Sequence, residues 1–147
     1  MKRISIVIIA IILLSFHNAS SQEANDIIDK CVATAGSDVT YLTDFKISLP
    51  AATDKNHPPV LKKSVILRKN TTYRFTICNN ENSEDEGVLK LFDIDKIIIS
   101  SHNPKTGKTY QSVNFQCSKT GPYTIFFYFK EGKSGDAIGI LSYVGKK

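Results

Sequence analysis

Apolar residues follow three different patterns along this chain of 147 residues. Ile4–Leu14 is an almost continuous apolar run, interrupted only by Ser5. Apolar side chains next recur at helical spacing over residues 26–35. From Asp44 onward they alternate with polar side chains, as in strands with one buried face. The chain therefore divides into a leader, a helix and a long β region.

The helical pattern predicts a short N-terminal helix over residues 26–35. Asn25 is suited to cap it, and Asp26 and Asp29 place negative charge in its first turn. Gly36 is suited to end it. A single apolar stripe indicates that this helix packs against an edge or an end of the β region. The stripe consists of Ile27, Ile28, Cys31 and Val32.

Eight segments after residue 44 have the composition and alternation of strands, and turns rich in Gly, Pro, Asn and Asp separate them. No helical pattern interrupts the series, which favours an all-β, antiparallel β-sandwich. The expected strands are Phe45–Leu49, Val65–Leu67, Thr72–Ile77, Val88–Phe92, Lys96–Ser101, Val113–Cys117, Tyr123–Phe129 and Ala137–Val144.

Tyr123–Phe129 differs from the other expected strands because it is apolar at nearly every position. Such a run is typical of a central strand that is covered on both faces. An apolar strand at a sheet edge would also promote aggregation. We therefore expect this strand in the middle of a sheet.

The leader has the features of a secretory signal peptide over residues 1–21. Lys2 and Arg3 give it a positive start, and the small residues Ala19–Ser21 suit a cleavage site at its end. Its apolar run is shorter than the roughly 20 apolar residues of a membrane-spanning helix. We therefore expect an exported protein, periplasmic or extracellular. Its residues 22–147 would form one domain without stable membrane insertion.

The net charge changes when the leader is removed. Cleavage takes away two of the 19 basic side chains, so the net charge falls from +5 to +3. The remaining basic residues form no stripe with interleaved aromatics, so nucleic acid is not an expected partner. Ordinary solubility accounts for a charge of this size.

Three cysteines remain after the leader, and export permits a disulfide between two of them. Cys78 and Cys117 both lie at the expected ends of core strands, so we expect a bridge between them. Cys31 then remains as a buried thiol on the helix. A catalytic cysteine would need a histidine close by, and only His57 and His102 remain, both in polar loops. We therefore expect structural roles for all three cysteines.

Three segments resemble bacterial pre-peptidase C-terminal domains. They are the opening strand pair Leu67–Ile77, the strand Val88–Asp93 that ends in an aspartate turn, and the Gly-x-Tyr strand Gly121–Ile125. The similarity covers about Lys62–Phe129, and the related eukaryotic Golgi-dynamics (GOLD) sandwich shares its layout. The resemblance implies a jelly-roll type of β-sandwich with about eight strands. The family usually occurs as a tail on a secreted peptidase, which implies an accessory role.

The end of the chain resembles small exported proteins of Bacteroidota. This likeness rests on the segment Gly135-x-Ala137-x-Gly139-Ile140-Leu141-Ser142. It agrees with export but implies no particular activity.

Acidic side chains gather in one polar loop, where Glu81 precedes Glu84, Asp85 and Glu86. If the sheet is a simple meander, two more acids of the next turn would lie near this loop. Carboxylate oxygens are calcium ligands, but the spacing does not match an EF-hand loop. A solvated acidic loop is the simpler interpretation. No cofactor is otherwise expected, and the calcium candidates are Glu84, Asp85, Glu86, Asp93 and Asp95.

No other pattern predicts a catalytic or binding site. The two histidines lack the paired spacing of a zinc site, and no Gly-x-Ser-x-Gly turn is present. Most aromatic residues lie on expected strands, where core packing explains them. Tyr110, Tyr128 and Tyr143 are the candidates for an exposed ring that stacks on a sugar.

The sequence therefore favours a non-enzymatic exported binding or accessory module, with a protein or glycan partner that it does not identify. A small secreted hydrolase is one alternative and would need a deep pocket with perturbed titratable groups. A secreted peptidase inhibitor is another and would need an ordered, protruding loop. Residues 79–87 and 102–108 are the candidates for such a loop.

Overall fold

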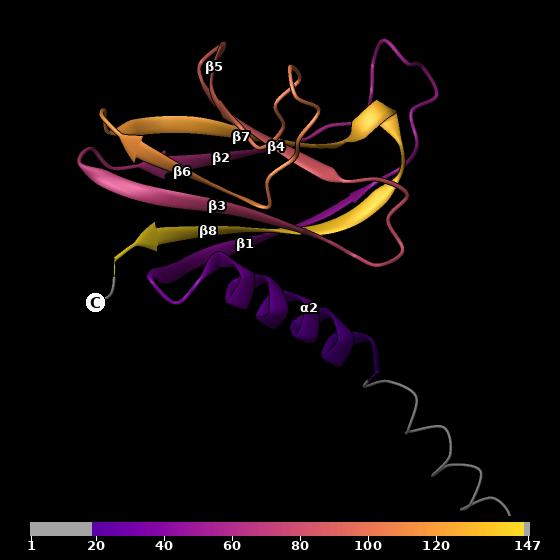
Figure 1. Cartoon of the computed structure of the whole chain (residues 1–147), viewed down its shortest axis with the longest axis horizontal. Coiled ribbons are helices and arrows are strands. Elements are labelled where there is room, and N and C mark those ends of the chain that lie inside the picture. The colour runs from indigo at the N-terminus through magenta and orange to yellow at the C-terminus, as the bar shows by residue number, and fades with distance from the viewer. Residues whose placement is uncertain (1–18, 146–147) are drawn as a thin grey trace, which may run out of the picture.

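All eight expected strands are present in the computed structural model, which describes residues 19–145 (Figure 1). Most of them extend beyond the predicted ends, and the first begins several residues earlier than expected. The strands are β1 (Val39–Leu49), β2 (Leu61–Leu67), β3 (Thr71–Asn79), β4 (Gly87–Asp93), β5 (Lys96–Ser100), β6 (Ser112–Cys117), β7 (Gly121–Phe129) and β8 (Gly135–Val144). A helix, α2 (Ala19–Ala35), precedes them, and a short 3-10 turn, η2 (Lys130–Gly132), joins β7 to β8.

The strands form two four-stranded antiparallel sheets, ordered β1-β8-β3-β6 and β2-β7-β4-β5. Successive strands cross between the sheets except at the hairpin from β4 to β5. This is the strand order of a jelly roll. The expected fold class, an all-β sandwich of jelly-roll type with an N-terminal helix, is confirmed.

Large side chains of both sheets meet in one core. Every second residue of β3 and β7 points inward, because side chains alternate along a strand. Small residues on β8 leave space for the rings: a Cβ at Gly139 would lie 2.8 Å from a ring carbon of Phe127. The buried side chains of the two strands are Tyr73, Phe75, Ile77, Tyr123, Ile125, Phe127 and Phe129.

Strand β7 lies between β2 and β4, so its expected central position is confirmed. The expectation that it is covered on both faces is wrong. Its odd-numbered residues from Tyr123 onward are buried, whereas Thr124, Phe126 and Tyr128 are only half-buried. Aromatic residues tolerate such a position because a large ring can be partly covered and partly wet.

Helix α2 begins earlier than the sequence predicted and ends where it predicted. It continues through Asn25, which therefore does not cap it. The residues before Asn25 contain no Pro or Gly to stop a helix. Gly36 ends the helix with a φ of 105°, and its N–H donates to the carbonyl oxygen of Ala33 at 3.1 Å. A left-handed residue of this kind is where glycine is favoured.

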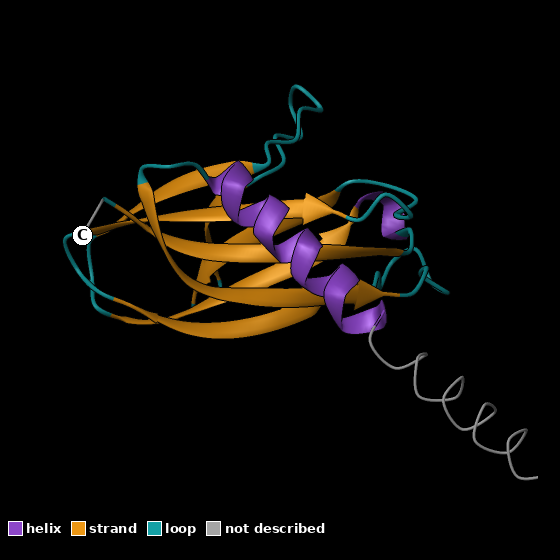
Figure 2. Cartoon of the chain, turned by 90° about the horizontal axis from the view of Figure 1, so that it is seen from below, coloured by secondary structure: helices purple, strands orange, loops and turns teal. Residues whose placement is uncertain are grey.

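Helix α2 covers the outer face of the β1-β8-β3-β6 sheet (Figures 1 and 2). Its predicted apolar stripe, which includes Ile27, Ile28 and Val32, packs on Ile138 and Ile140 of β8. We call this outer surface the covered face. The stripe is therefore the packing side of the helix, as predicted, but the expected location at an edge or an end is wrong, because α2 lies across the central strands β8 and β3 of the sheet.

The expected disulfide between Cys78 and Cys117 is wrong, because Cys78 is bonded to Cys31 of α2. Cys117 pairs with Thr71 in the sheet, and Cys78 lies seven residues farther along β3, roughly 23 Å away at about 3.3 Å per residue. A bridge needs Cα atoms within roughly 7 Å of each other. The two cysteines also point to opposite faces: Cys117 lies in the core, and Cys78 packs under the helix.

The predicted signal peptide lies mostly outside the described residues, which begin at Ala19. The expected cleavage after Ser21 falls within the first turn of α2. Among residues 19–145, no helix is long and apolar enough to cross a membrane. The Cys31–Cys78 disulfide is of a kind that persists in oxidising compartments, and it therefore supports export.

Candidate functional site

The outer face of the β2-β7-β4-β5 sheet lies on the side of the sandwich away from α2 (Figure 1). Paired residues of neighbouring strands share a face, so the register defines which side chains point outward. Most of these outward side chains are exposed or half-buried. We call the following group the aromatic-lysine face: Lys62, Ser64, Ile66, Lys90, Phe92, Ile97, Thr124, Phe126 and Tyr128.

Phe126 is the centre of this face. Lys62 of β2 and Lys90 of β4 both pair with it, one from each side. The ammonium nitrogen of Lys62 lies 4.7 Å from the centroid of the Phe126 ring. The ring of Phe92 packs against Phe126 with 4.3 Å between centroids, and Lys90 places its ammonium 4.9 Å from the centroid of Tyr128.

These contacts protect an aromatic surface from water without burying it. An ammonium group over a ring is attracted by the electrons of the ring face, and the contact contributes about 0.5–1 kcal/mol at an exposed site. The methylene stem of a lysine also covers apolar area while its charge stays in water. Because Lys62 is exposed, its side chain can leave the ring at little cost.

Two isoleucines extend the apolar part of the face beyond the rings. Ile66 is 68% exposed and Ile97 is 51% exposed, on the two edge strands of the sheet. An isolated exposed isoleucine needs no explanation, but Ile97 lies opposite the half-buried Phe92 and forms a patch with it, while Ile66 lies opposite Pro122 at the other edge. Patches of this kind mark binding surfaces on soluble proteins.

A hollow adjoins the Tyr128 end of the face. Its volume is about 410 Å³, and its walls include Lys55, Pro58, Tyr128 and Glu131. The wall from the β1–β2 loop is fixed, because the backbone N–H of Ala52 donates to the carbonyl oxygen of Gly132 at 2.6 Å. The face thus combines half-buried rings with a hollow at one end.

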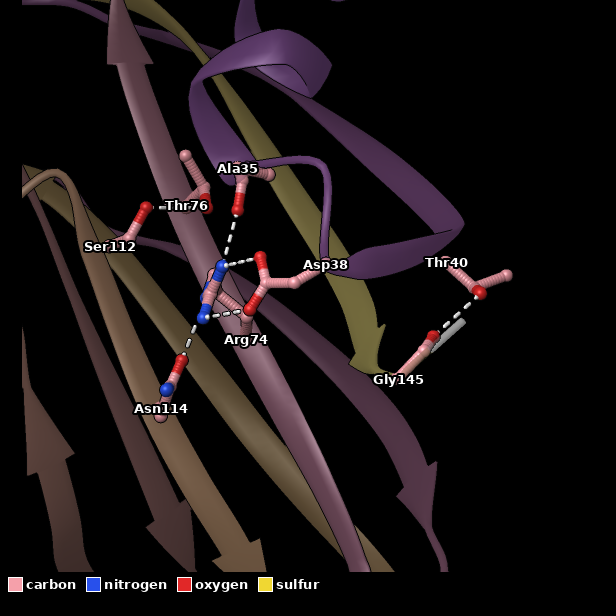
Figure 3. Close-up of polar contacts among 8 residues, drawn as sticks. All are labelled: Ala35, Asp38, Thr40, Arg74, Thr76, Ser112, Asn114 and Gly145. Atoms are coloured by element: carbon pink, nitrogen blue, oxygen red, sulfur yellow. Dashed lines mark hydrogen bonds and ion pairs between the residues drawn. The ribbon is translucent and has the colours of Figure 1, made fainter. Parts of the chain in front are cut away.

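On the opposite side of the sandwich, a polar cluster closes the C-terminal end of α2 (Figure 3). Arg74 of β3 donates to the carbonyl oxygen of Ala35 at 2.7 Å and forms a two-pronged pair with the carboxylate of Asp38 at 2.7 and 3.1 Å. Its third nitrogen donates to Asn114 of β6 at 2.8 Å. The guanidinium is thus engaged on all three nitrogens within the protein, so this cluster holds the helix rather than a ligand.

Two neighbouring polar contacts complete the same region (Figure 3). The hydroxyls of Thr76 and Ser112 lie 2.8 Å apart across β3 and β6. The hydroxyl of Thr40 donates to the carbonyl oxygen of Gly145 at 3.1 Å. These bonds tie strands of the covered face together.

The predicted calcium candidates are not brought together. Asp85 and Glu86 instead lie 3.6 and 3.2 Å from the ammonium groups of Lys133 and Lys130. Asp93 and Asp95 lie at the far end of β4, whose seven residues span roughly 20 Å. Within residues 19–145, no group of three or more His, Cys, Asp or Glu side chains could hold a metal ion. The acidic loop and the β4–β5 turn are therefore separate features.

The two histidines also have local partners. Nδ1 of His57 lies 2.7 Å from the Asp54 carboxylate on an exposed loop, and this contact holds the pKa of Asp54 below its usual value. Nδ1 of His102 lies 3.1 Å from the hydroxyl of Thr109. Both contacts stabilise the loop in which they occur.

The unpaired cysteine, Cys117, belongs to the core. It is buried, and its thiol donates to the carbonyl oxygen of Lys119 at 3.1 Å. The hydroxyl of Tyr123 donates to the same oxygen at 2.8 Å. Burial, together with the contact to Cys117, raises the pKa of Tyr123 to about 12. Cys117 therefore contributes to the packing of this end of the core.

Of the three tyrosines predicted as exposed rings, only Tyr128 belongs to the aromatic-lysine face. Tyr110 is 43% exposed in the loop between β5 and β6, with the ammonium of Lys108 at 5.0 Å from its ring centroid. Tyr143 is 37% exposed at the end of β8. The face therefore has one predicted ring and two rings, Phe92 and Phe126, that the sequence analysis did not single out.

A signal for Phe126 was present in the sequence. Thr124 and Tyr128 carry hydroxyls and share its parity along the strand, whereas Tyr123 is the only hydroxyl-bearing residue of the other parity. The outward face was therefore the one that contains Thr124. The lysines gave no such signal, because their position beside Phe126 depends on strand register.

Comparison with protein-family models finds no match, and no curated protein matches the sequence. Solved structures do match the fold. The pre-peptidase C-terminal domain of a collagenase from Bacillus anthracis aligns with a TM-score of 0.50 and 15% identity, over 67% of this chain and 87% of that one. A periplasmic inhibitor of g-type lysozyme from Aeromonas hydrophila aligns with a TM-score of 0.49 and 11% identity, over 71% and 85%.

The collagenase domain confirms the fold that the strand motifs resembled. At this identity the likeness concerns the arrangement of strands and not the activity. The chain therefore has the fold of a pre-peptidase C-terminal domain.

Proposed function

We propose that this chain is an exported, non-enzymatic binding module that uses the aromatic-lysine face to hold its partner. The signal peptide would be removed after Ser21, and residues 22–147 would act in the periplasm or outside the cell. One observation carries the proposal. The face leaves three contiguous rings only half-buried, at Phe92, Phe126 and Tyr128, on the sheet that α2 does not cover.

Stability alone does not account for such a face. A strand exposed to water usually carries polar side chains on its outer positions. Large rings there contribute less to folding than buried rings, and they increase the tendency to aggregate. In a complex the same rings would be fully buried, and aromatic residues dominate the energy of binding surfaces.

The test is capture from the native cell envelope with an affinity-tagged chain and two matched variants. Phe126→Ser removes the central ring of the face. Tyr110→Ser removes another exposed ring with a lysine over it, outside the face. We expect one protein or glycan to be retained by the original chain and by Tyr110→Ser, and lost with Phe126→Ser.

Circular dichroism of both variants serves as the folding control. If Phe126→Ser is folded and retains the same partner as the original chain, the aromatic-lysine face is not the binding surface. If Tyr110→Ser alone loses the partner, binding occurs at the β5–β6 loop instead, and the proposal is wrong.

A further inference from the structure

The charged members of the aromatic-lysine face are both positive, and the adjoining hollow adds one charge of each sign, from Lys55 and Glu131. Lys62 and Lys90 are the only ionisable groups of the face apart from the phenol of Tyr128, and its remaining members are hydroxyl, aliphatic or aromatic. The nearest acid along β4, Asp93, follows Phe92 and so points to the other side of the sheet. The face therefore presents positive charge around an apolar centre.

A second copy of this chain does not complement such a face. In a two-fold dimer the same patch meets itself, so lysines would face lysines. Like charges opposed across an interface are strongly unfavourable. The complementary surface must instead carry negative charge.

The apolar residues of the aromatic-lysine face favour a protein partner over a glycan partner. Sugar stacking needs an open ring face, but Phe92 packs against the Phe126 ring with 4.3 Å between centroids and a tilt of 32°. The exposed aliphatic side chains of Ile66 and Ile97 offer nothing to sugar hydroxyls. They match apolar side chains, which occupy the centre of protein interfaces within a polar rim.

We infer that the partner is an acidic protein surface with apolar side chains at its centre. This inference rests on the proposed function of the face and adds the chemistry of what it binds. Carboxylates of the partner draw the ammonium groups of Lys62 and Lys90 away from the rings, and the partner's apolar groups then cover Phe126. The hollow beside Tyr128, at about 410 Å³, has room for one anchoring side chain.

Short synthetic peptides test this chemistry directly. The first alternates Glu and Phe, the second alternates Lys and Phe, and the third alternates Glu and Ser. Each is titrated into the isotope-labelled protein with its disulfide intact, and backbone amide shifts are followed by NMR. We expect saturable shifts confined to β2, β7, β4 and β5 with the Glu-Phe peptide. The Lys-Phe and Glu-Ser peptides should bind much more weakly, because the first lacks negative charge and the second lacks apolar side chains.

The charge-neutral variant Lys62→Gln/Lys90→Gln is the matched control. It keeps the rings, so we expect it to bind the Glu-Phe peptide at least about fivefold more weakly than the original chain, with less dependence on salt. Equal affinity of the variant, equal binding of the Lys-Phe peptide, or no binding of the Glu-Phe peptide would overturn the inference.

Two further probes represent other classes of anionic partner. Alginate is an anionic glycan, and vesicles of phosphatidylglycerol present an anionic membrane surface. If either one shifts the amides of the face while the Glu-Phe peptide does not, the partner is not a protein and the inference is wrong.

The capture experiment separates this failure from failure of the proposed function. Suppose that Lys62→Gln/Lys90→Gln captures the native partner as well as the original chain does, while Phe126→Ser loses it. In that case the face is the binding surface, but it does not recognise negative charge, and only the inference is wrong. If Phe126→Ser also keeps the partner, both proposals are wrong.

Discussion

The two outer faces of this sandwich are both formed by four-stranded antiparallel sheets, but their outward side chains differ in type and in how they are covered. On the covered face, β8 presents the aliphatic side chains of Ile138 and Ile140, and α2 buries them. On the aromatic-lysine face, β7 presents Phe126 and Tyr128 with lysines laid over them, away from the helix. The aliphatic groups beneath α2 are permanently covered, whereas the rings, lysine stems and isoleucines of the other face stay partly in contact with water.

The two faces also differ in the contacts that cover them. Helix α2 is held by a disulfide, a hydrophobic cluster and the Arg74 contacts at its C-terminal end. The aromatic-lysine face has only side-chain contacts that can exchange. The comparison indicates that the covered face serves stability. Together with our proposal that the other face serves binding, it predicts how substitutions on each should behave.

The largest effect should follow loss of the disulfide on the covered face. Cys31→Ala/Cys78→Ala opens a loop with a sequence separation of 47 residues. Chain entropy gives a loss of about 4 kcal/mol in the free energy of unfolding for a loop of this length. Urea unfolding measures it, and a reductant should reproduce the loss in the original chain. An unfolding midpoint that does not change with reductant would contradict a stabilising bridge.

A matched pair of isoleucines compares the two faces directly. Ile140→Ala removes a side chain that is 2% exposed beneath α2 and should cost about 3 kcal/mol. Ile66→Ala removes one that is 68% exposed on the other face and should change stability by less than about 0.5 kcal/mol. Thermal or urea unfolding gives both values. Similar costs at the two positions would show that the faces do not differ as described.

Arg74 should contribute somewhat less than Ile140. Arg74→Met leaves the carbonyl oxygen of Ala35 and the side chain of Asn114 without this donor, and should cost about 2 kcal/mol. Hydrogen exchange should show the last turn of α2 opening first. Arg68→Met, at an exposed arginine in the β2–β3 turn, is the control and should leave unfolding unchanged. Equal behaviour of the two variants would remove Arg74 from the attachment of the helix.

The smallest effect should come from the lysines over the rings. Lys62→Gln/Lys90→Gln removes two cation–ring contacts, one at the exposed Lys62 and one at the half-buried Lys90, and such a contact contributes about 0.5–1 kcal/mol at an exposed site. The unfolding midpoint should therefore fall only slightly, although binding should weaken. A large loss of stability would mean that these lysines serve the fold.

Most of the fold could be predicted from local pattern. Alternation, or a short apolar run between turn residues, located all eight strands, and Gly36 marked the end of α2. The disulfide could not be predicted from strand ends alone, because it depends on which face each cysteine occupies and on register. Cys78 has the opposite parity to the buried Phe75 and Ile77, and this parity did indicate that Cys78 points to the outer face. Its bond to Cys31 of the helix could be identified only from the three-dimensional arrangement.

The aromatic-lysine face was harder to predict from the sequence, and the reason again lies in strand register. In β7 almost every residue is apolar, so the hydrophobic pattern does not separate inner from outer positions. The pairing of Phe126 with Lys62 and Lys90 joins three strands that are distant in sequence. Only the register of the sheet brings them together.

Site-specific photo-crosslinking in the native host tests the central claim most directly. A photoreactive benzoylphenylalanine is placed at Ser64, an exposed position of the aromatic-lysine face that leaves every ring in place, and separately at Ala33, an exposed position of α2. The account predicts one discrete protein adduct from Ser64 and none from Ala33. An adduct from Ala33 with none from Ser64 would contradict it and assign binding to the helix side of the molecule.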